Sequence, residues 1–332
     1  MQTAGLILFF VVALGFDFTN GFHDAANAIA VSIATKALRP ITALTMAAVL
    51  NVVGALISTK VAATVGKGII TVPHGTHGLS VVFAALVGAI AWNLLTWRLA
   101  LPSSSTHALI GGLVGAAVAS STIVEWHGVV QKVVIPMVAS PIIGLFLGYF
   151  VMVAIMWAFR SKRSNEVNRG FKRAQPFSSA AVAFSHGTQD AQKTMGVITL
   201  ALVTTGHLSN FQVPFWVILA AAGAMGLGTL AGGWRIVRTL GNRITALDAP
   251  RGFAAQTSTS AVLLVSAYLY AFPVSSTHVM TSTIMGVGAS RRATAVRWGI
   301  ARQIGLAWIL TIPGAAVSAW LVYQIVRLAV GP

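Results

Sequence analysis

Residues 15–28, GFDFTNGFHDAANA, place four polar side chains at helical spacing inside an apolar stretch. Asp17, Asn20, Asp24 and Asn27 are separated by three, four and three positions, so a helix would carry all four on one face. A carboxylate in the middle of a bilayer costs about 2.5–3.5 kcal/mol on the insertion scale. Two carboxylates on one face therefore indicate an interior site for a cation, a proton or a substrate. The alternative is a polar stripe that only holds helices together.

A second motif, SHGTQDAQKTMG at 185–196, repeats this layout with different residues. Asp190 corresponds to the later acid of the first motif, Lys193 to its last amide and His186 to its first amide. These three side chains would again share one face of a helix. A lysine buried among apolar residues needs a partner, so we expect Lys193 to pair with Asp24 or Asp190. The alternative is an ion pair that only fixes helix packing.

Two related segments, PSSSTH at 102–107 and PVSSTH at 273–278, each precede an apolar run. Proline suits the first turn of a helix and Ser or Thr its N-cap, so each segment predicts a helix start. The free N–H groups and dipole of a helix N-terminus attract anions. Hydroxyl donors would add to this attraction at Ser104, Ser105, Thr106, Ser275, Ser276 and Thr277. The alternative is that these hydroxyls only cap helices. For His107 and His278, two roles stay open: orienting the loops or contacting the substrate.

The composition defines the environment in which these motifs must work. The chain has 332 residues, of which 56% are hydrophobic and only 8% charged, as expected for a multi-pass membrane protein. Its net charge of +16 comes from basic residues that lie between apolar runs. That placement favours the positive-inside rule over nucleic-acid binding. With no cysteine, disulfides and thiolate metal sites are excluded.

The apolar runs divide the chain into two similar halves. We expect a first membrane repeat at 1–159, a basic cytoplasmic linker at 160–176 and a second repeat at 177–332. Ten apolar runs are expected to form about five membrane elements in each repeat, at about 4–34, 41–65, 79–97, 103–120, 131–159, 178–205, 213–234, 252–272, 274–290 and 298–326. The acidic motif and the Ser/Thr segment recur in the same order in both halves, which indicates a duplication.

The charge distribution predicts how the halves are oriented. With the basic linker in the cytoplasm and the runs alternating across the membrane, most of the 22 lysines and arginines fall on the cytoplasmic side. The opposite side holds Lys60, Lys67, Lys132 and Arg327. An odd number of crossings in each half makes the repeats inverted and puts both termini outside. We therefore expect an all-α polytopic membrane protein of two inverted repeats with broken or re-entrant helices. The first helix is expected to be broken or distorted near Gly15 and Gly21.

The motifs together resemble a known family. GFHDAANA with PSSSTH, repeated as GTQDAQKT with PVSSTH, is similar to the PiT inorganic phosphate transporters, the PHO4 family. The resemblance implies phosphate symport, an inverted-repeat fold and usually a homodimer. The ending Gln192-Lys193-Thr194-Met195-Gly196 resembles the bacterial low-affinity, proton-coupled branch, where phosphate is thought to move as a neutral complex with Mg²⁺ or another divalent cation. Sodium-coupled members keep an N-D-x-A-N-A form in the second motif, where this chain has Gln189-Asp190-Ala191-Gln192-Lys193.

We therefore expect a plasma-membrane phosphate–proton symporter that is not an enzyme and has no resident cofactor or metal. Its partners would be inorganic phosphate and the lipid bilayer. Substrate-binding residues are expected at Asp24, Asn27, Ser104, Ser105, Thr106, Asp190, Lys193, Ser275, Ser276 and Thr277. Asp24 and Asp190 would accept protons from the substrate or carry the coupling proton. A second tier is expected at Asp17, Asn20, His186 and Gln189.

Three alternatives stay open at this point. The closest is a sodium-coupled or sulfate transporter of the same family. A different class is a metal-dependent membrane hydrolase using His23, Asp24 and His186, although the chain has no H-E-x-x-H signature. The third is an anion channel. Coupling of uptake to an ion gradient, competition by sulfate and hydrolysis by the purified protein would separate these possibilities.

Overall fold

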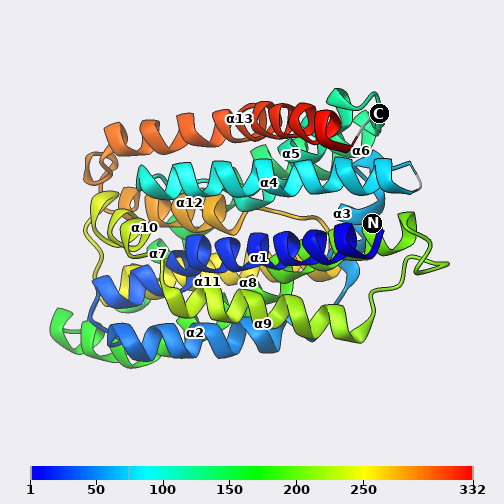
Figure 1. Ribbon diagram of the computed structural model, residues 1–332. Coiled ribbons are helices and arrows are strands. Elements are labelled where there is room, and N and C mark those ends of the chain that lie inside the picture. The colour runs from blue at the N-terminus through cyan, green and yellow to red at the C-terminus, as the bar shows by residue number, and fades with distance from the viewer. Residues whose placement is uncertain (1, 74, 331–332) are drawn as a thin grey trace.

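The computed structural model describes residues 2–73 and 75–330 and is nearly all helical (Figure 1). The first half contains α1 (Gln2–Ala34), α2 (Pro40–Ala55), α3 (Lys60–Lys67), β1 (Ile70–Thr71), α4 (Thr76–Arg98), α5 (Ser105–Ala119), β2 (Ile123–Val124), α6 (Trp126–Val129), the π-helix η1 (Val130–Val134) and α7 (Ile135–Ala158). The second half contains α8 (Ser164–Thr204), α9 (Phe215–Ala231), α10 (Trp234–Arg238), the π-helices η2 (Thr239–Arg243) and η3 (Ser266–Tyr270), α11 (Ala249–Val265), α12 (Ser276–Ala289), the 3₁₀ turn η4 (Ala293–Ala295) and α13 (Trp298–Val330).

Several of these helices are long and apolar enough to cross a membrane. Among the described residues, four meet this test singly, at Gly5–Ala34, Thr76–Arg98, Trp126–Ala158 and Trp298–Ala329. Two further spans are broken: α2 and α3 meet at a 74° bend, and α9 meets the α10–η2 segment at 59°. These breaks confirm the expectation of an all-helical membrane protein with broken helices. The apolar faces of α7 and α13 are exposed, for example at Phe150 and Ile309, as expected for lipid-facing surfaces.

The expected break in the first helix is wrong, because α1 continues as one helix from Gln2 to Ala34. Gly21 serves helix packing instead. A Cβ atom there would lie 2.4 Å from the carbonyl oxygen of Met225 on α9, so only glycine allows the two backbones to come this close. Close approach at small residues is the usual basis of helix association in membranes.

The second-half motif lies on an unusually long helix. The basic segment 160–176 is mostly helical, since α8 begins at Ser164 and runs for 41 residues to Thr204. At 1.5 Å per residue its length is about 60 Å, roughly twice the hydrocarbon thickness of a bilayer. The exposed basic start of α8 therefore extends beyond the membrane, and the buried remainder carries His186, Asp190 and Lys193.

Packing between the two halves is reciprocal. Helix α1 packs against α9 as α8 packs against α2, and α5 packs against α13 as α12 packs against α7. The close crossings match as well: Gly21 and Gly228 bring α1 and α9 together, and Gly187 and Gly54 do the same for α8 and α2. This is the packing that a twofold relation between duplicated halves would produce. The inverted orientation of the repeats stays a prediction.

Two apolar clusters enclose the middle of the bundle. One contains Phe9 and Phe16 from the first part of α1, and the other contains Ile29 and Val31 from its last part. The polar residues of α1 lie between these two clusters. The fold thus places the polar motif halfway along the first helix, with apolar packing toward both ends.

Candidate functional site

The polar face of α1 is buried at the centre of the bundle, as its spacing predicted. Asn20, Asp24 and Asn27 are almost completely buried. Each contacts the beginning of another helix through its side chain. Asp24 is also held by its neighbour on the same helix, because His23 Nδ1 lies 2.9 Å from Asp24 Oδ1. Burial of a carboxylate requires compensation of this kind.

The polar face of α8 forms an ion-paired cluster. Asp190 lies between two partners, with His186 Nε2 2.9 Å from Oδ2 and Lys193 Nζ 3.0 Å from Oδ1. Lys193 therefore pairs with Asp190 and not with Asp24, which the spacing had left open. Its ammonium also donates to Thr106 Oγ1 of α5 at 2.7 Å. A fixed positive charge thus joins the second-half motif to the first-half Ser/Thr segment.

The N-terminus of α5 meets the polar face of α1. Ser104 is the N-cap, and its hydroxyl accepts from the backbone N–H of His107 at 3.2 Å. The Ser105 hydroxyl lies between Asn20 Oδ1 and Asp24 Oδ2, at 2.5 Å from each. Ser104 therefore caps the helix, and its role as a hydroxyl donor to an anion stays a prediction.

The N-terminus of α12 meets the same point from the other half. Ser275 is the N-cap and accepts from the backbone N–H of His278 at 3.2 Å. Asn27 Nδ2 donates to Ser276 Oγ at 3.2 Å and to Thr277 Oγ1 at 2.9 Å. The two hydroxyls then donate to carboxylates: Ser276 to Asp190 Oδ2 at 3.4 Å and Thr277 to Asp24 Oδ1 at 3.1 Å. Four elements, α1, α5, α8 and α12, therefore converge on one polar centre.

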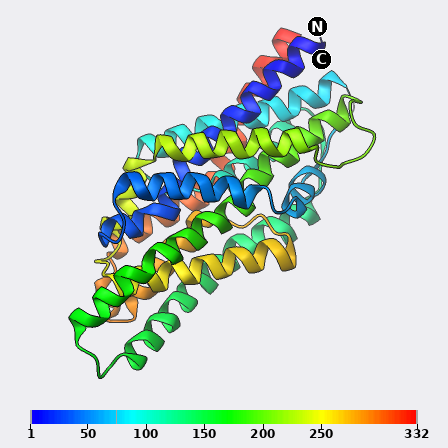
Figure 2. The same ribbon diagram turned by 90° about the horizontal axis from the view of Figure 1, so that it is seen from below.

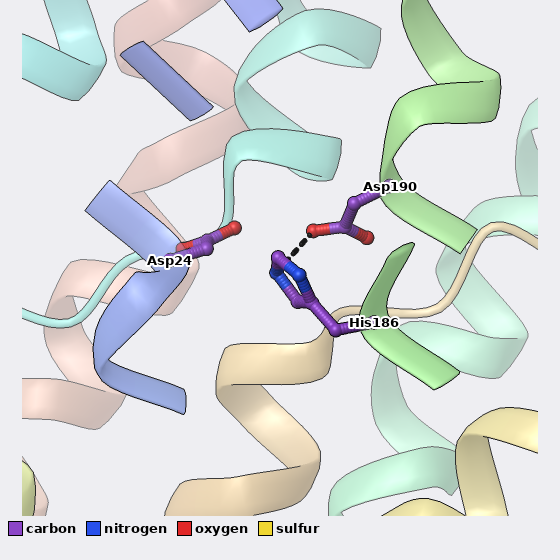
Figure 3. Close-up of side chains that lie close together, drawn as sticks. All are labelled: Asp24, His186 and Asp190. Carbon is purple, nitrogen blue, oxygen red and sulfur yellow. Dashed lines mark ion pairs between the residues drawn. The ribbon is translucent and has the colours of Figure 1, made fainter. Parts of the chain in front are cut away.

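The side chains closest to the centre could also hold a cation. Figure 3 shows Asp24 on α1 and His186 and Asp190 on α8 pointing toward one another. One ligand atom from each lies within 4.8 Å of the others. We expected no metal site from the sequence, because acid and histidine ligands from different helices leave no local spacing pattern. The Lys193 ammonium beside Asp190 competes with any ion held there.

The two histidines that end the Ser/Thr segments contact each other. The ring centroids of His107 and His278 are 4.8 Å apart, and His278 stacks on Trp308 of α13 with centroids 4.0 Å apart. Both rings are buried. They join the beginnings of α5 and α12 directly, which favours an orienting role over direct contact with the substrate.

Two of the expected second-tier residues lie away from the centre. Gln189 donates to the backbone carbonyl of Leu263 at 2.9 Å, so it faces α11. Asp17 is buried one turn before Asn20, beside Thr194. His186 instead belongs to the ion-paired cluster.

Sequence reasoning missed several supporting residues. Asn51 Oδ1 lies 3.3 Å from His186 Nδ1, and Thr96 Oγ1 lies 3.3 Å from His23 Nε2. Ser103 donates to Thr96 at 2.8 Å. An amide within the apolar run at 41–65 was a visible signal for Asn51. Nothing in the local pattern linked Thr96 to His23, because only the tertiary structure brings α4 beside α1.

A buried polar centre where two helix starts meet inside a membrane bundle is typical of multi-pass secondary transporters. Residues 20–319 match the phosphate transporter family. The chain belongs to this family.

Relatives named "Probable low-affinity inorganic phosphate transporter" extend over nearly the whole chain. The Mycobacterium bovis protein is 46% identical, covering 100% of this chain and 80% of its own length. The Bacillus subtilis protein is 42% identical, covering 97% of both chains. The Rhizobium meliloti protein is 45% identical, covering 96% of this chain and 95% of its own.

A solved structure titled "The sodium-dependent phosphate transporter" has the same fold. It matches with a TM-score of 0.87 over 98% of this chain and 99% of its own, at 24% identity. At this identity the likeness concerns the fold. The relatives and the family are transporters, so the expectation of a non-enzyme is confirmed.

Proposed function

We propose that this protein imports inorganic phosphate across the plasma membrane by symport with protons. The observation that carries the proposal is the convergence of two helix N-termini on Asp24, Asp190 and Lys193. Free N–H groups, hydroxyls and one ammonium supply donors for phosphate oxygens. The carboxylates accept hydrogen bonds from the protonated oxygens of hydrogen phosphate. Membership of the phosphate transporter family and the names of the relatives support phosphate as the substrate.

The position of Lys193 supports protons over sodium as the coupling ion. Its ammonium is 3.0 Å from Asp190 and 2.7 Å from Thr106, so it occupies the space and supplies the charge that a bound sodium ion would otherwise contribute. Two unit charges 4 Å apart repel by about 4 kcal/mol at an effective dielectric constant of about 20. That repulsion would weaken sodium binding by roughly a thousandfold.

Uptake of radiolabelled phosphate into proteoliposomes, with pH and sodium gradients imposed separately, tests this function. We expect uptake in sodium-free buffer, acceleration by an inward proton gradient and collapse with a protonophore. Sulfate should compete weakly, because it carries no proton at neutral pH to donate to the two carboxylates. An absolute need for sodium would overturn proton coupling, and uptake independent of any gradient would indicate a channel.

A second candidate concerns the form in which phosphate is carried. The ligand atoms of Asp24, His186 and Asp190 lie within 4.8 Å of one another, and carboxylate and imidazole groups suit divalent cations. A divalent cation carried with hydrogen phosphate would make the cargo neutral and would satisfy these groups during transport. Phosphate-dependent uptake of radiolabelled Mn²⁺ by the same proteoliposomes would support it. Full phosphate uptake after removal of divalent cations by chelation would contradict it.

A further inference from the structure

Asp17 differs from the other two acids of the membrane bundle in having no ion-pair partner among the described residues. Its side chain is 0% exposed. Neither carboxylate oxygen meets the full geometry of a hydrogen bond with a described residue, although the polar side chains of Thr194 and Asn20 lie beside it. Asp24 and Asp190, by contrast, each accept from hydroxyls and pair with a histidine or lysine. Burial away from any paired cation disfavours an ionised carboxylate and stabilises the neutral acid.

The immediate neighbours of Asp17 are also unsatisfied. Thr194 on α8 and Asn20 on α1 face its carboxylate. Both are buried, and within the described part of the chain neither Thr194 Oγ1 nor Asn20 Nδ2 has a partner. Asn20 presents its amide N–H₂ group here because its oxygen already accepts from Ser105. Two carboxylate oxygens facing a hydroxyl and an amide donor suit a proton better than a metal cation, which would be repelled by the amide hydrogens.

The charged groups near Asp17 lie on α8. They are Lys193 and Asp190. Three other long helices pack along α1. Helices α2 and α9 carry no titratable side chain, and α4 carries only His77 and Arg98, which lie at its two ends. At the remaining contacts with α1, the titratable residues are His107 on α5, His278 on α12, Arg251 on α11, Arg235 and Arg238 on α10, and Arg243 on η2.

We propose that Asp17 carries the coupling proton, while Asp24 and Asp190 bind the substrate. The proposal rests on proton symport as the proposed function. Asn20 connects the two sites, because its oxygen accepts from Ser105 and the same Ser105 hydroxyl contacts Asp24. A protonated Asp17 donates to the Thr194 hydroxyl oxygen, and an ionised Asp17 accepts from the Asn20 amide and the Thr194 hydroxyl. Loss of the proton therefore draws Asn20 toward Asp17 and changes the hydrogen bond at the phosphate site.

The test uses Asp17→Asn, which keeps the shape of the acid and resembles its protonated form. Steps in which the carrier holds its proton should proceed, and steps that require proton release should fail. In proteoliposomes we expect exchange of labelled for unlabelled phosphate across the membrane to stay within about twofold of the unmodified protein. Net uptake driven by a pH gradient should fall at least tenfold. Net uptake that remains fully driven by the pH gradient would overturn the assignment.

A second variant keeps the proposal testable if Asp17→Asn does not fold. Thr194→Val removes a neighbouring hydroxyl that would stabilise the ionised acid, so the external pH that gives half-maximal uptake should rise by at least half a unit. The matched control is Thr199→Val on the same helix, whose hydroxyl donates to the Met195 carbonyl at 2.7 Å and which should leave this pH unchanged. An unshifted Thr194→Val profile would overturn the assignment.

The outcome for the unmodified protein separates the two proposals. If sodium and not protons drives its uptake, the proposed function fails and the assignment of Asp17 fails with it. If protons drive the unmodified protein and both variants keep its pH response, only the assignment of Asp17 fails.

Discussion

At the scale of single residues, this protein buries acids with unequal compensation. Asp24 has His23, Ser105 and Thr277 as partners. Asp190 has a lysine and a histidine, so the α8 cluster is nearly balanced in charge. Breaking such a buried pair on one side leaves an uncompensated charge. The function of each acid can therefore be tested with substitutions that keep its volume.

Asp24→Asn and Asp190→Asn should each reduce phosphate uptake at least tenfold, while the protein still reaches the membrane. The amide keeps the shape of the acid but can no longer accept hydrogen bonds on both atoms or exchange a proton. The measurement is uptake normalised to the protein found in the membrane fraction. Glu166→Gln, at an exposed position at the start of α8, serves as the control and should change little. Normal uptake by either Asp variant would remove that residue from the mechanism.

Lys193→Asn should lose most phosphate uptake, because the variant lacks the only fixed positive charge that contacts the hydroxyls of α5 among the described side chains. It also removes the repulsion that opposes a mobile cation at this position. The residual uptake should therefore increase with an inward sodium gradient, which should have no effect on the unmodified protein. Uptake by Lys193→Asn at the unmodified rate would contradict both the binding role and the coupling argument.

At the scale of elements, glycine contacts position the helices that carry the site. A Cβ atom at Gly187 would lie 2.1 Å from the carbonyl oxygen of Asn51 on α2. Gly187 is adjacent to His186, which the Asn51 side chain contacts. Close backbone contact between α8 and α2 thus fixes the orientation of the cluster around Asp190. We therefore predict that a larger side chain at the α8–α2 contact lowers both the stability of the protein and its transport activity.

Gly187→Ala should destabilise the protein by about 1–3 kcal/mol, the usual range for overpacking, and should reduce uptake. Thermal unfolding of the purified protein in detergent measures the first effect. The matched control is Gly223→Ala on α9, where a Cβ atom would have no neighbour within 4 Å and where alanine favours the helix by about 0.5–1 kcal/mol. Equal melting temperatures for the two variants would show that this crossing does not require glycine.

At the scale of the whole molecule, the start of α1 and the end of α13 lie at the end of the bundle opposite the basic segment. The N-terminal end of α1 and the C-terminal end of α13 occupy one end of the bundle, and the connection between α7 and α8 lies at the other (Figures 1 and 2). Basic side chains make contacts at the latter end, where Arg235 donates to the Arg98 carbonyl. The polarity agrees with our proposal that both termini are outside and the basic segment is in the cytoplasm. The expected homodimer stays a proposal.

Single cysteines test the topology cleanly, because the chain contains none. Ser164→Cys, in the exposed start of α8, should react with a membrane-impermeant maleimide only from the cytoplasmic side. Ser209→Cys, in the exposed loop between α8 and α9, should react only from outside. The two positions flank the buried part of α8, so the same labelling pattern for both would contradict a single crossing by this helix.

The sequence by itself determined the class of protein, most of the helices and the polar face of α1. Apolar runs separated by basic residues require membrane helices, and the spacing of Asn20, Asp24 and Asn27 requires a polar face on one of them. The repeated Ser/Thr segments predicted the starts of α5 and α12 because proline and the N-cap residues act locally. These inferences succeeded because each depends on residues within one or two helical turns.

Only the tertiary structure decided which of these residues contact each other. The pairing of Lys193 with Asp190 and Thr106, the cluster of Asp24 with His186, and the contact between His107 and His278 join helices far apart in the sequence. That Asp17 forms no ion pair with a described residue is likewise invisible in its motif, where it stands at the same helical spacing as the residues that find partners. Helix crossing geometry, set by glycines such as Gly21 and Gly187, determines which buried polar groups find partners and which do not.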